Sequence, residues 1–442
     1  MGWGMSEIVT NDIINYAGTK SDFSKKSSFL GSITRMRFQL LSGMLIAIIA
    51  PAIARGQLER FVDQLASYDN SIIGTTLAFL LSFFFFQKIT SFPGIRQTQY
   101  ILPAFAAGYL IVIVLFFFLR LEYSRYQFLA SFSMTSAWFF FLFIVSRSSN
   151  KIKLAVIPGG QVGLIEDIKF VELTHLKSPN DSVKNIPIVV DMNNALSPEW
   201  EKFITERSLA GQSVYHVKQV TESLSGRARV DKMSENKFGS LTPTTVYAPA
   251  KFYIDWLGAV TAFVFLLPLL TAVAIAIRLE SKGPAIFKQQ RMGFRGKPFT
   301  IYKFRSMRVQ DPNTIDRNSE MTQSDDDRIT RVGRFIRKNR IDELPQILNI
   351  LRGEMSWIGP RPEALKLSQW YDEKLPYYQF RHFVRPGITG WAQVNQGHVT
   401  SLEDAEVKLQ YDFFYVRNLS LWLDILVFLK TTQVVLTGNG AK

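Results

Sequence analysis

The chain has 442 residues, enough for two or three domains, and 47% of them are hydrophobic, including 36 Phe. It contains no cysteine, which excludes disulfides and thiolate metal sites. The net charge of +14 predicts an anionic partner, such as phospholipid headgroups or a phosphorylated substrate. Because the apolar residues are clustered and no nucleic-acid-binding motif accompanies the charge, the composition favours a membrane protein over a nucleic-acid-binding protein.

After a polar leader over 1–36, which we expect on the cytoplasmic side, four long apolar runs follow: 38–54, 72–89, 101–119 and 128–145. Each approaches the roughly 20 residues that a helix needs to cross the hydrocarbon core, and none has a charge in its middle. Basic residues precede the first run and follow the fourth, so the positive-inside rule places both ends in the cytoplasm. We therefore predict a membrane bundle of four transmembrane helices over 37–147.

The sequence pattern of the next region, 151–242, is typical of a soluble α/β module. KLAVIP, IPIVVD and SVYHVKQV predict strands and PEWEKFITERSLAG predicts a helix, an alternation typical of a small parallel sheet. In the turn PGGQVG, Pro158 stands where a dinucleotide fingerprint requires its first glycine. We interpret the region as a degenerate Rossmann-like α/β module. A working dinucleotide site is the less favoured alternative.

A fifth apolar run, 252–277, follows a linker over 243–250 and is also long enough to span a membrane. Lys251 precedes it and Lys282 follows it, which favours the cytoplasmic side for both ends. Pro268, near its middle, removes a helix hydrogen bond and can break the helix. We predict a re-entrant membrane helix, broken at Pro268, that enters and leaves by the same leaflet. A fifth crossing is the alternative.

Two adjacent carboxylates, Asp342 and Glu343, stand just ahead of Pro345, a residue favoured at the first position of a helix. A helix over Pro345–Arg352, closed by Gly353, would put both carboxylates at its start. Arginines lie on both sides of the pair in the sequence. The pattern leaves two interpretations: ion pairs on a solvated surface, or a site for a divalent metal and a phosphorylated substrate.

The motifs around the pair resemble those of the bacterial sugar transferase family. They are D-R-I-T-R-V-G-R-F-I-R-K, I-D-E-L-P-Q, N-I-L-R-G-E-M-S and I-G-P-R-P, with Y-K-F-R-S-M upstream and V-R-P-G-I-T-G-W-A-Q-V-N downstream. The resemblance runs from about residue 251 to the C-terminus. Members are monotopic phosphoglycosyl transferases that load a sugar phosphate onto a polyprenol phosphate, and they carry a helix–break–helix anchor where 252–277 lies.

The resemblance implies an α/β catalytic domain over 251–442, with Asp342 as the nucleophile and Glu343, together with Asp342, holding Mg²⁺. It implies that phosphate and nucleotide are bound by cations, for which the candidates are Lys303, Arg305, Arg337, Arg361, Arg381 and Arg385. The implied substrates are a UDP-sugar and undecaprenyl phosphate, in a ping-pong reaction in which UMP leaves first. Direct attack by the lipid phosphate and a non-catalytic membrane scaffold are the alternatives.

The larger architecture resembles members that use UDP-glucose or UDP-galactose, so we expect an unmodified hexose, with an N-acetylated or diacetamido sugar as the alternative. The expected location is the bacterial inner membrane, in contact with its phospholipid and with the catalytic domain on the cytoplasmic face. The expected role is the first membrane step of exopolysaccharide, capsule or O-antigen synthesis. A homodimer is a further implication. We also predict a loop over 312–327 and an interfacial helix over 419–436, interrupted by Asp424 and Lys430.

Overall fold

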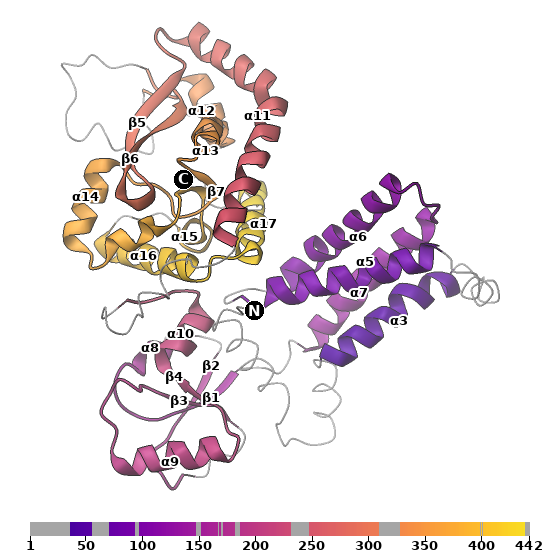
Figure 1. Cartoon of the computed structure of the whole chain (residues 1–442), viewed down its shortest axis with the longest axis vertical. Coiled ribbons are helices and arrows are strands. Elements are labelled where there is room, and N and C mark those ends of the chain that lie inside the picture. Colours follow the sequence, from indigo (N-terminus) through magenta and orange to yellow (C-terminus); the bar gives the residue numbers. More distant parts are fainter. Residues whose placement is uncertain are drawn as a thin grey trace. The chain divides into compact units, whose positions relative to one another are not determined.

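The computed structural model describes residues 36–54, 70–92, 97–146, 152–166, 168, 171–181, 186–230, 247–308, 328–397, 399 and 401–437. The chain divides into two units, Met1–Gly226 and Arg227–Lys442 (Figure 1). The second unit begins earlier than the predicted catalytic domain, since the Ala228 N–H donates to the Gln410 carbonyl. The leader over 1–35, the predicted loop over 312–327 and the first half of the predicted linker lie outside the described residues.

Four apolar helices form a bundle in the first unit: α3 (Met36–Ala54), α5 (Asn70–Thr90), α6 (Ile101–Phe118, preceded by η1, Gln97–Tyr100) and α7 (Arg125–Ser146). Their centre is aromatic, and the rings of Phe105 and Phe139 lie 4.9 Å apart. Gly108 brings α6 against α5, because a Cβ there would lie 2.2 Å from the Ser82 Oγ. The four predicted helices are confirmed and are compatible with a membrane region. By length and composition α5, α6 and α7 are able to cross, whereas α3 is shorter.

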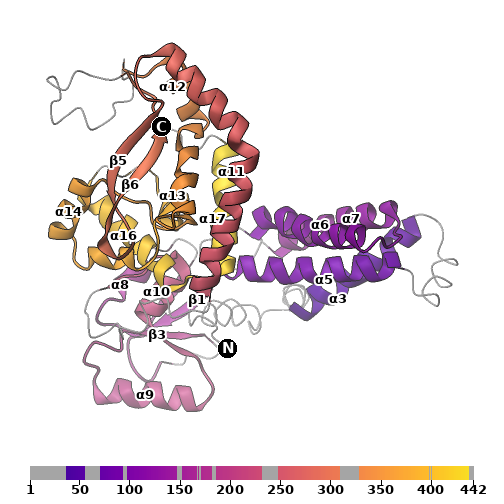
Figure 2. The same cartoon turned by 45° about the horizontal axis from the view of Figure 1, so that its top comes forward.

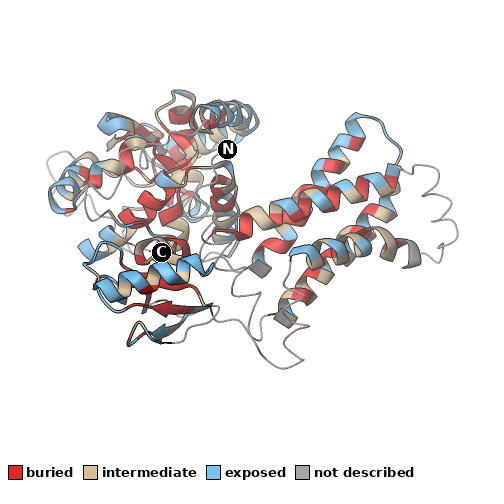
Figure 3. Cartoon of the chain, turned by 60° about the horizontal axis from the view of Figure 1, so that its bottom comes forward, coloured by how far each residue is buried: buried red, intermediate tan, exposed pale blue. Residues whose placement is uncertain are grey.

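The α/β module of the first unit has a parallel sheet in the order β2-β1-β3-β4, made of β1 (Ile152–Val156), β2 (Val171–His175), β3 (Ile188–Val190) and β4 (Val214–His216). The predicted helix is α9 (Pro198–Leu209), and α8 (Gly163–Glu166) follows the glycine turn. Figure 3 shows the central strands buried and α9 largely exposed. The parallel α/β prediction is confirmed, and β2 is an edge strand that it lacked.

One predicted strand of the module is partly wrong. SVYHVKQV forms β4 only as far as His216, after which α10 (Val217–Ser225) begins. The His216 Nδ1 accepts the Lys218 N–H and so caps this helix. Val217, Val220 and Leu224, spaced as on one helical face, pack into the core beneath the sheet.

The glycine turn after β1 is filled by a side chain of the module itself. A Cβ at Gly160 would lie 2.2 Å from the Asp191 Oδ2, which accepts the Gln161 N–H at 2.9 Å. The other oxygen of Asp191 accepts the Asn193 N–H at 3.0 Å. A carboxylate therefore occupies the place where a dinucleotide fingerprint receives phosphate, which supports the degenerate interpretation.

The second unit is built along α11 (Tyr247–Glu280), a single helix of 34 residues and about 51 Å. Figure 2 shows its ribbon bending as it runs past the domain. The predicted helix break at Pro268 is wrong, because helical conformation continues through it. Residues on both sides of Pro268, such as Phe263 and Val273, pack on the same domain, and this packing holds the helix together through the proline. Whether α11 is re-entrant stays a prediction.

The α/β domain beside α11 has two small sheets. One is the antiparallel hairpin β5 (Ile286–Met292) and β6 (Pro298–Phe304), joined by η3 (Phe294–Gly296), and the other is the parallel pair β7 (Ser356–Ile358) and β8 (Gly387–Thr389). The helices around them are α12 (Arg331–Lys338), η6 (Ile341–Gln346), α13 (Ile347–Leu351), α14 (Leu365–Lys374), η7 (Tyr378–Phe383), α15 (Trp391–Asn395), α16 (Leu402–Arg417) and α17 (Leu421–Thr437).

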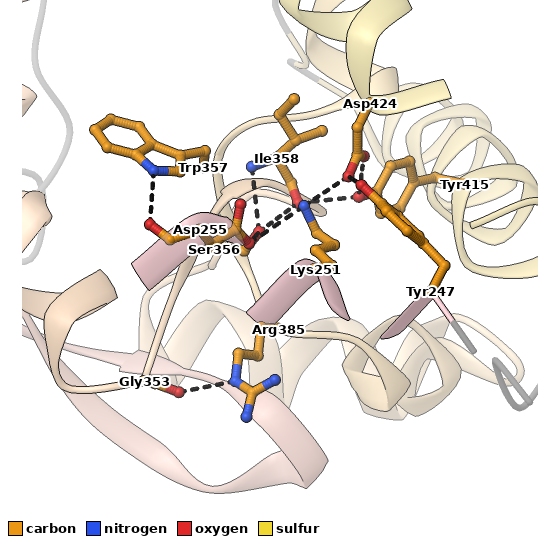
Figure 4. Close-up of polar contacts among 10 residues, drawn as sticks. All are labelled: Tyr247, Lys251, Asp255, Gly353, Ser356, Trp357, Ile358, Arg385, Tyr415 and Asp424. Carbon is orange, nitrogen blue, oxygen red and sulfur yellow. Dashed lines mark hydrogen bonds and ion pairs between the residues drawn. The ribbon is translucent and has the colours of Figure 1, made fainter. Parts of the chain in front are cut away.

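The two charges that interrupt the apolar run of α17 are bound within this unit. Asp424 accepts from the Lys251 Nζ at 2.7 Å and from the Tyr247 hydroxyl at 2.6 Å, as Figure 4 shows. The Lys430 ammonium donates to the Asn395 Oδ1 at 2.5 Å and lies over the Trp391 ring. α17 is thus packed on one side. Its place at a membrane interface stays a prediction.

Candidate active site

The carboxylate pair lies in a tighter turn than the sequence predicts. Asp342 and Glu343 are in the first turn of η6, a 3₁₀ helix that includes Pro345, and α13 continues from Ile347. Arg340 starts η6 with a left-handed backbone, φ 55°. The predicted end is confirmed, since Gly353 follows α13 with φ 75°. η6 packs on β6 and so carries the pair towards that strand.

Lys303 extends from β6 towards the pair. Phe299 and Ile301, at alternate positions on this strand, pack into the core with α11 and α13, and Lys303 continues the same face. Its ammonium lies 3.4 Å from the Glu343 Oε1. Burial lowers the pKa of Lys303, and the Glu343 charge opposes that shift.

Glu343 is held by Arg361 as well as by Lys303. The Arg361 guanidinium donates to both Glu343 oxygens, at 2.5 Å to Oε1 and 3.4 Å to Oε2, and Arg340 lies 3.8 Å from Oε1. Burial by itself would raise the pKa of Glu343, but the charges of Arg361 and Lys303 outweigh it and hold the pKa at about 2. Glu343 is therefore ionised at neutral pH and balances a cationic site.

Asp342 differs from its neighbour. Its Oδ1 is buried and has no hydrogen-bond partner among the residues that the structure describes. Burial, and then the charge of Glu343, raise the pKa of Asp342, and the nearby cations Lys303, Arg340 and Arg337 offset part of this shift. The site thus holds one satisfied carboxylate and one carboxylate with a buried oxygen free to react or bind.

Arg361 is fixed from three directions. It follows β7 after Gly359 and Pro360, and its guanidinium also donates to the Ile388 carbonyl of β8 at 3.2 Å. The Arg381 side chain donates to its backbone carbonyl at 2.7 Å. β7 is itself anchored to α11, since the Ser356 hydroxyl donates to Asp255 at 2.5 Å (Figure 4). This framework explains why a proline-flanked turn presents one arginine to Glu343.

The structure brings Asp342, Glu343, Lys303 and Arg361 together, with Arg337 near enough to affect the pKa of Asp342. Among the described residues, the other three predicted cations make no ion pair with the two carboxylates. Arg305 donates to the Ser281 and Lys282 carbonyls at the end of α11, Arg381 is buried against Asp412 and Tyr378, and Arg385 lies over the Phe252 ring. Each of these guanidinium groups binds other parts of the same unit in this structure.

Two histidines near these motifs are interpreted from the sequence as structural. Burial, and then Arg381, lower the pKa of His382 to about 3, so this side chain is neutral and fits the interpretation. His398 lies outside the described residues.

Sequence reasoning missed Asn349, which ties the strand of Lys303 to the helix of Asp342. Its side-chain Oδ1 accepts the Tyr302 N–H at 3.1 Å, and its Nδ2 donates to the Thr300 carbonyl at 2.7 Å. The amide thus pairs with β6 as a neighbouring strand would. Asn349 lies inside the family motif N-I-L-R-G-E-M-S, and this position is the sequence feature that marks it.

A resident Mg²⁺ is compatible with this donor set. Among the described residues no group of three or more His, Cys, Asp or Glu could hold a metal. Mg²⁺ in phosphoryl-transfer sites usually takes one or two carboxylates together with substrate phosphates and water. The free Asp342 Oδ1, with Glu343 beside it, meets that requirement.

Comparison with known proteins agrees with these motifs. The bacterial sugar transferase family matches residues 246–438. The chain is 39% identical over 405 residues to the UDP-N-acetylgalactosamine-undecaprenyl-phosphate N-acetylgalactosaminephosphotransferase of Aeromonas hydrophila, covering 90% of this chain and 94% of that protein. The chain therefore belongs to the bacterial sugar transferase family and is an enzyme.

Other relatives match less than half of the chain. The chain is 43% identical over 205 residues to the UDP-glucose:undecaprenyl-phosphate glucose-1-phosphate transferase of Xanthomonas campestris pv. campestris, covering 46% of this chain and 42% of that protein. It is 39% identical over 194 residues to the exopolysaccharide production protein PSS of Rhizobium leguminosarum bv. phaseoli, covering 42% of this chain and 95% of that protein. The last match covers nearly all of a relative that is much shorter than this chain.

Proposed function

We propose that the chain transfers a sugar 1-phosphate from a UDP-sugar to undecaprenyl phosphate, with release of UMP, through a phosphosugar carried on Asp342. The family and the activities for which the relatives are named support this reaction class. The covalent route is carried by one observation, the buried and unpartnered Oδ1 of Asp342 beside a cluster of cations. This activity would begin a repeat unit of exopolysaccharide, capsule or O-antigen.

In the first step an Asp342 oxygen attacks the phosphorus that bears the sugar. A new P–O bond forms to the carboxylate, and the P–O bond to the uridylate phosphate breaks, so UMP leaves with the bonding electrons. In the second step an oxygen of the lipid phosphate attacks the same phosphorus and the bond to Asp342 breaks. Both nucleophiles are already anions, so neither step requires a proton to be removed.

The residues around Asp342 fit this chemistry. The raised pKa of Asp342 makes its carboxylate more basic, and hence more nucleophilic once ionised. Lys303 and Arg361 place positive charge where the phosphates must sit, and Arg337 adds a cation from α12. Asp342 and Glu343 would hold a Mg²⁺, which would offset negative charge on the transferring phosphate.

For the sugar we propose N-acetylgalactosamine first. The Aeromonas relative named for this sugar matches 90% of the chain, whereas the glucose enzyme of Xanthomonas matches only 46% of it. The preference for an unmodified hexose rested on the long N-terminal half of the chain. The Aeromonas match shows that such a half is not specific to enzymes that use a hexose. Glucose remains the second candidate, because 205 residues of the chain are 43% identical to that enzyme.

The test is a UMP-release assay with the purified full chain, undecaprenyl phosphate, Mg²⁺ and a panel of UDP-sugars. We expect release that requires lipid and metal for multiple turnovers and is fastest with UDP-N-acetylgalactosamine. Fastest release with UDP-glucose or UDP-galactose would restore the hexose interpretation. No release with any nucleotide sugar would favour the scaffold alternative.

A further inference from the structure

A polar line runs along the helix that carries the carboxylates. Glu343, Gln346 and Asn349 are three residues apart, and their exposed fractions are 7%, 1% and 0%. The first and last both face β6, because Glu343 meets Lys303 and the Asn349 amide meets the backbone of Thr300 and Tyr302. Gln346 lies between them in the chain, at the end of η6, and is buried as they are.

Gln346 differs from both neighbours on this line because the donor atom of its amide, Nε2, is not paired. Its Nε2 is fully buried and has no hydrogen-bond partner among the residues that the structure describes. A buried donor left without a partner is destabilising, so such a group requires an explanation. The amide of Asn349, on the same line, makes three hydrogen bonds. The packing here therefore allows a buried amide to be paired, and Gln346 is the exception.

A second unpaired atom lies close by in the chain. The Oδ1 of Asp342, four residues before Gln346 in the same 3₁₀ helix, is also buried and has no partner among the described residues. One atom is an anionic acceptor and the other is a neutral donor. A phosphoryl group satisfies both at once, since its phosphorus is attacked by the carboxylate and its oxygens accept hydrogen bonds.

We infer that the Gln346 side-chain amide donates a hydrogen bond to a phosphoryl oxygen of the substrate while its phosphorus reacts at Asp342. This inference rests on the proposed function. Gln346 supplies a neutral donor among charged ones, so it stabilises the oxygen without adding another cation beside Glu343, Lys303 and Arg361. The energetic cost of its unpaired state in the free enzyme is relieved only when the phosphoryl group is bound.

The test is Gln346→Met, which keeps the length of the side chain and removes the amide. Because the Nε2 donor is buried and unpaired in the free enzyme, the variant should have a Tm equal to or above that of the wild type. With UDP-N-acetylgalactosamine and undecaprenyl phosphate, kcat should fall by about 10- to 100-fold, since a donor to the reacting phosphoryl group is lost. The KM for the UDP-sugar should change much less.

Asn349→Leu is the matched control, since it removes the paired amide on the same line and should lower Tm. A Gln346→Met enzyme with the wild-type kcat would overturn the inference. So would a Tm lowered as far as that of Asn349→Leu, because the amide would then be paired in the free enzyme. If the wild type turns over and Asp342→Asn does not, a fully active Gln346→Met removes this inference alone. A wild type without UMP release would instead contradict the proposed function.

Discussion

Asp191 of the α/β module and Asp342 of the second unit each lie where a sequence motif leads one to expect phosphate chemistry, and their surroundings differ. Asp191 fills its own glycine turn, and both its oxygens accept backbone N–H groups. Asp342 has a buried oxygen with no partner among the described residues. A carboxylate satisfied by its own backbone closes a turn, whereas one left unsatisfied and surrounded by cations is available to a ligand.

The largest expected effect comes from Asp342→Asn. The amide cannot attack phosphorus, so UMP release should fall by about 10⁴-fold or more. The fold should be retained, because the side chain keeps its shape and loses a charge that is costly to bury. UMP release and Tm, measured on the same detergent-purified protein, check both statements. Ordinary turnover in the variant would contradict the nucleophile assignment.

A second prediction concerns the geometry of the Glu343–Arg361 pair. Arg361→Lys keeps the charge but loses the fork that contacts both Glu343 oxygens, so kcat/KM should fall by about 100-fold. Arg385→Lys is the matched control, because Arg385 lies over Phe252 and outside the cluster. Equal losses in the two variants would show that the cluster has no special role.

The pH dependence of kcat/KM should follow the ionisation of the Asp342 carboxyl group. Since burial raises its pKa, the carboxylate is protonated and inactive below that pKa and ionised above it. The kcat/KM should therefore fall about tenfold per unit of pH on the acid side, at a pH above the ordinary aspartate value of about 3.9. Glu343, with its pKa held at about 2, contributes nothing in this range. In Asp342→Glu, any residual activity should show a shifted acid limb, and an unchanged limb would assign it to another group.

The same substitution in the module should affect stability and leave the chemistry unchanged. Asp191→Asn replaces one acceptor of a backbone N–H by a donor, so the module should lose about 1–2 kcal/mol of stability. The kcat for UMP release should equal that of the wild type. A loss of kcat without a loss of Tm would mean that the glycine turn takes part in the reaction.

The smallest effect is expected when the first unit is removed. The fragment Arg227–Lys442 has its own core along α11, so in detergent it should keep kcat within about threefold of the full chain. Circular dichroism would establish that the fragment is folded. A folded but inert fragment would show that the first unit contributes to catalysis.

Much of the fold follows from local pattern. The four apolar runs, the β1 and β3 strands and the end of α13 at Gly353 were predictable because burial, periodicity and capping act within a few residues. The uninterrupted course of α11 was not, because packing on both sides of Pro268 overrides a local helix breaker. The change from strand to helix at His216 was not predictable either. It depends on the His216 side chain, which caps α10, and strand propensity does not take such a cap into account.

For the site, the sequence identified the carboxylates but not which of the predicted cations contact them. Lys303 and Arg305 differ by two positions and would share one strand face, yet β6 ends at Phe304 and Arg305 turns to the carbonyls at the end of α11. Arg361 reaches Glu343 only through the pairing of β7 with β8. The unpaired amide of Gln346 depends on three-dimensional packing that no motif records.

The central claim, a phosphosugar carried on Asp342, is tested most directly by incubating the enzyme with UDP-sugar and Mg²⁺ in the absence of lipid. A rapid-quench assay should show a burst of UMP of at most one equivalent per enzyme, with mass spectrometry locating a sugar phosphate on the peptide that contains Asp342. Asp342→Asn should show neither. If UMP forms only when undecaprenyl phosphate is present and no adduct appears, the lipid phosphate attacks directly and the covalent account is wrong.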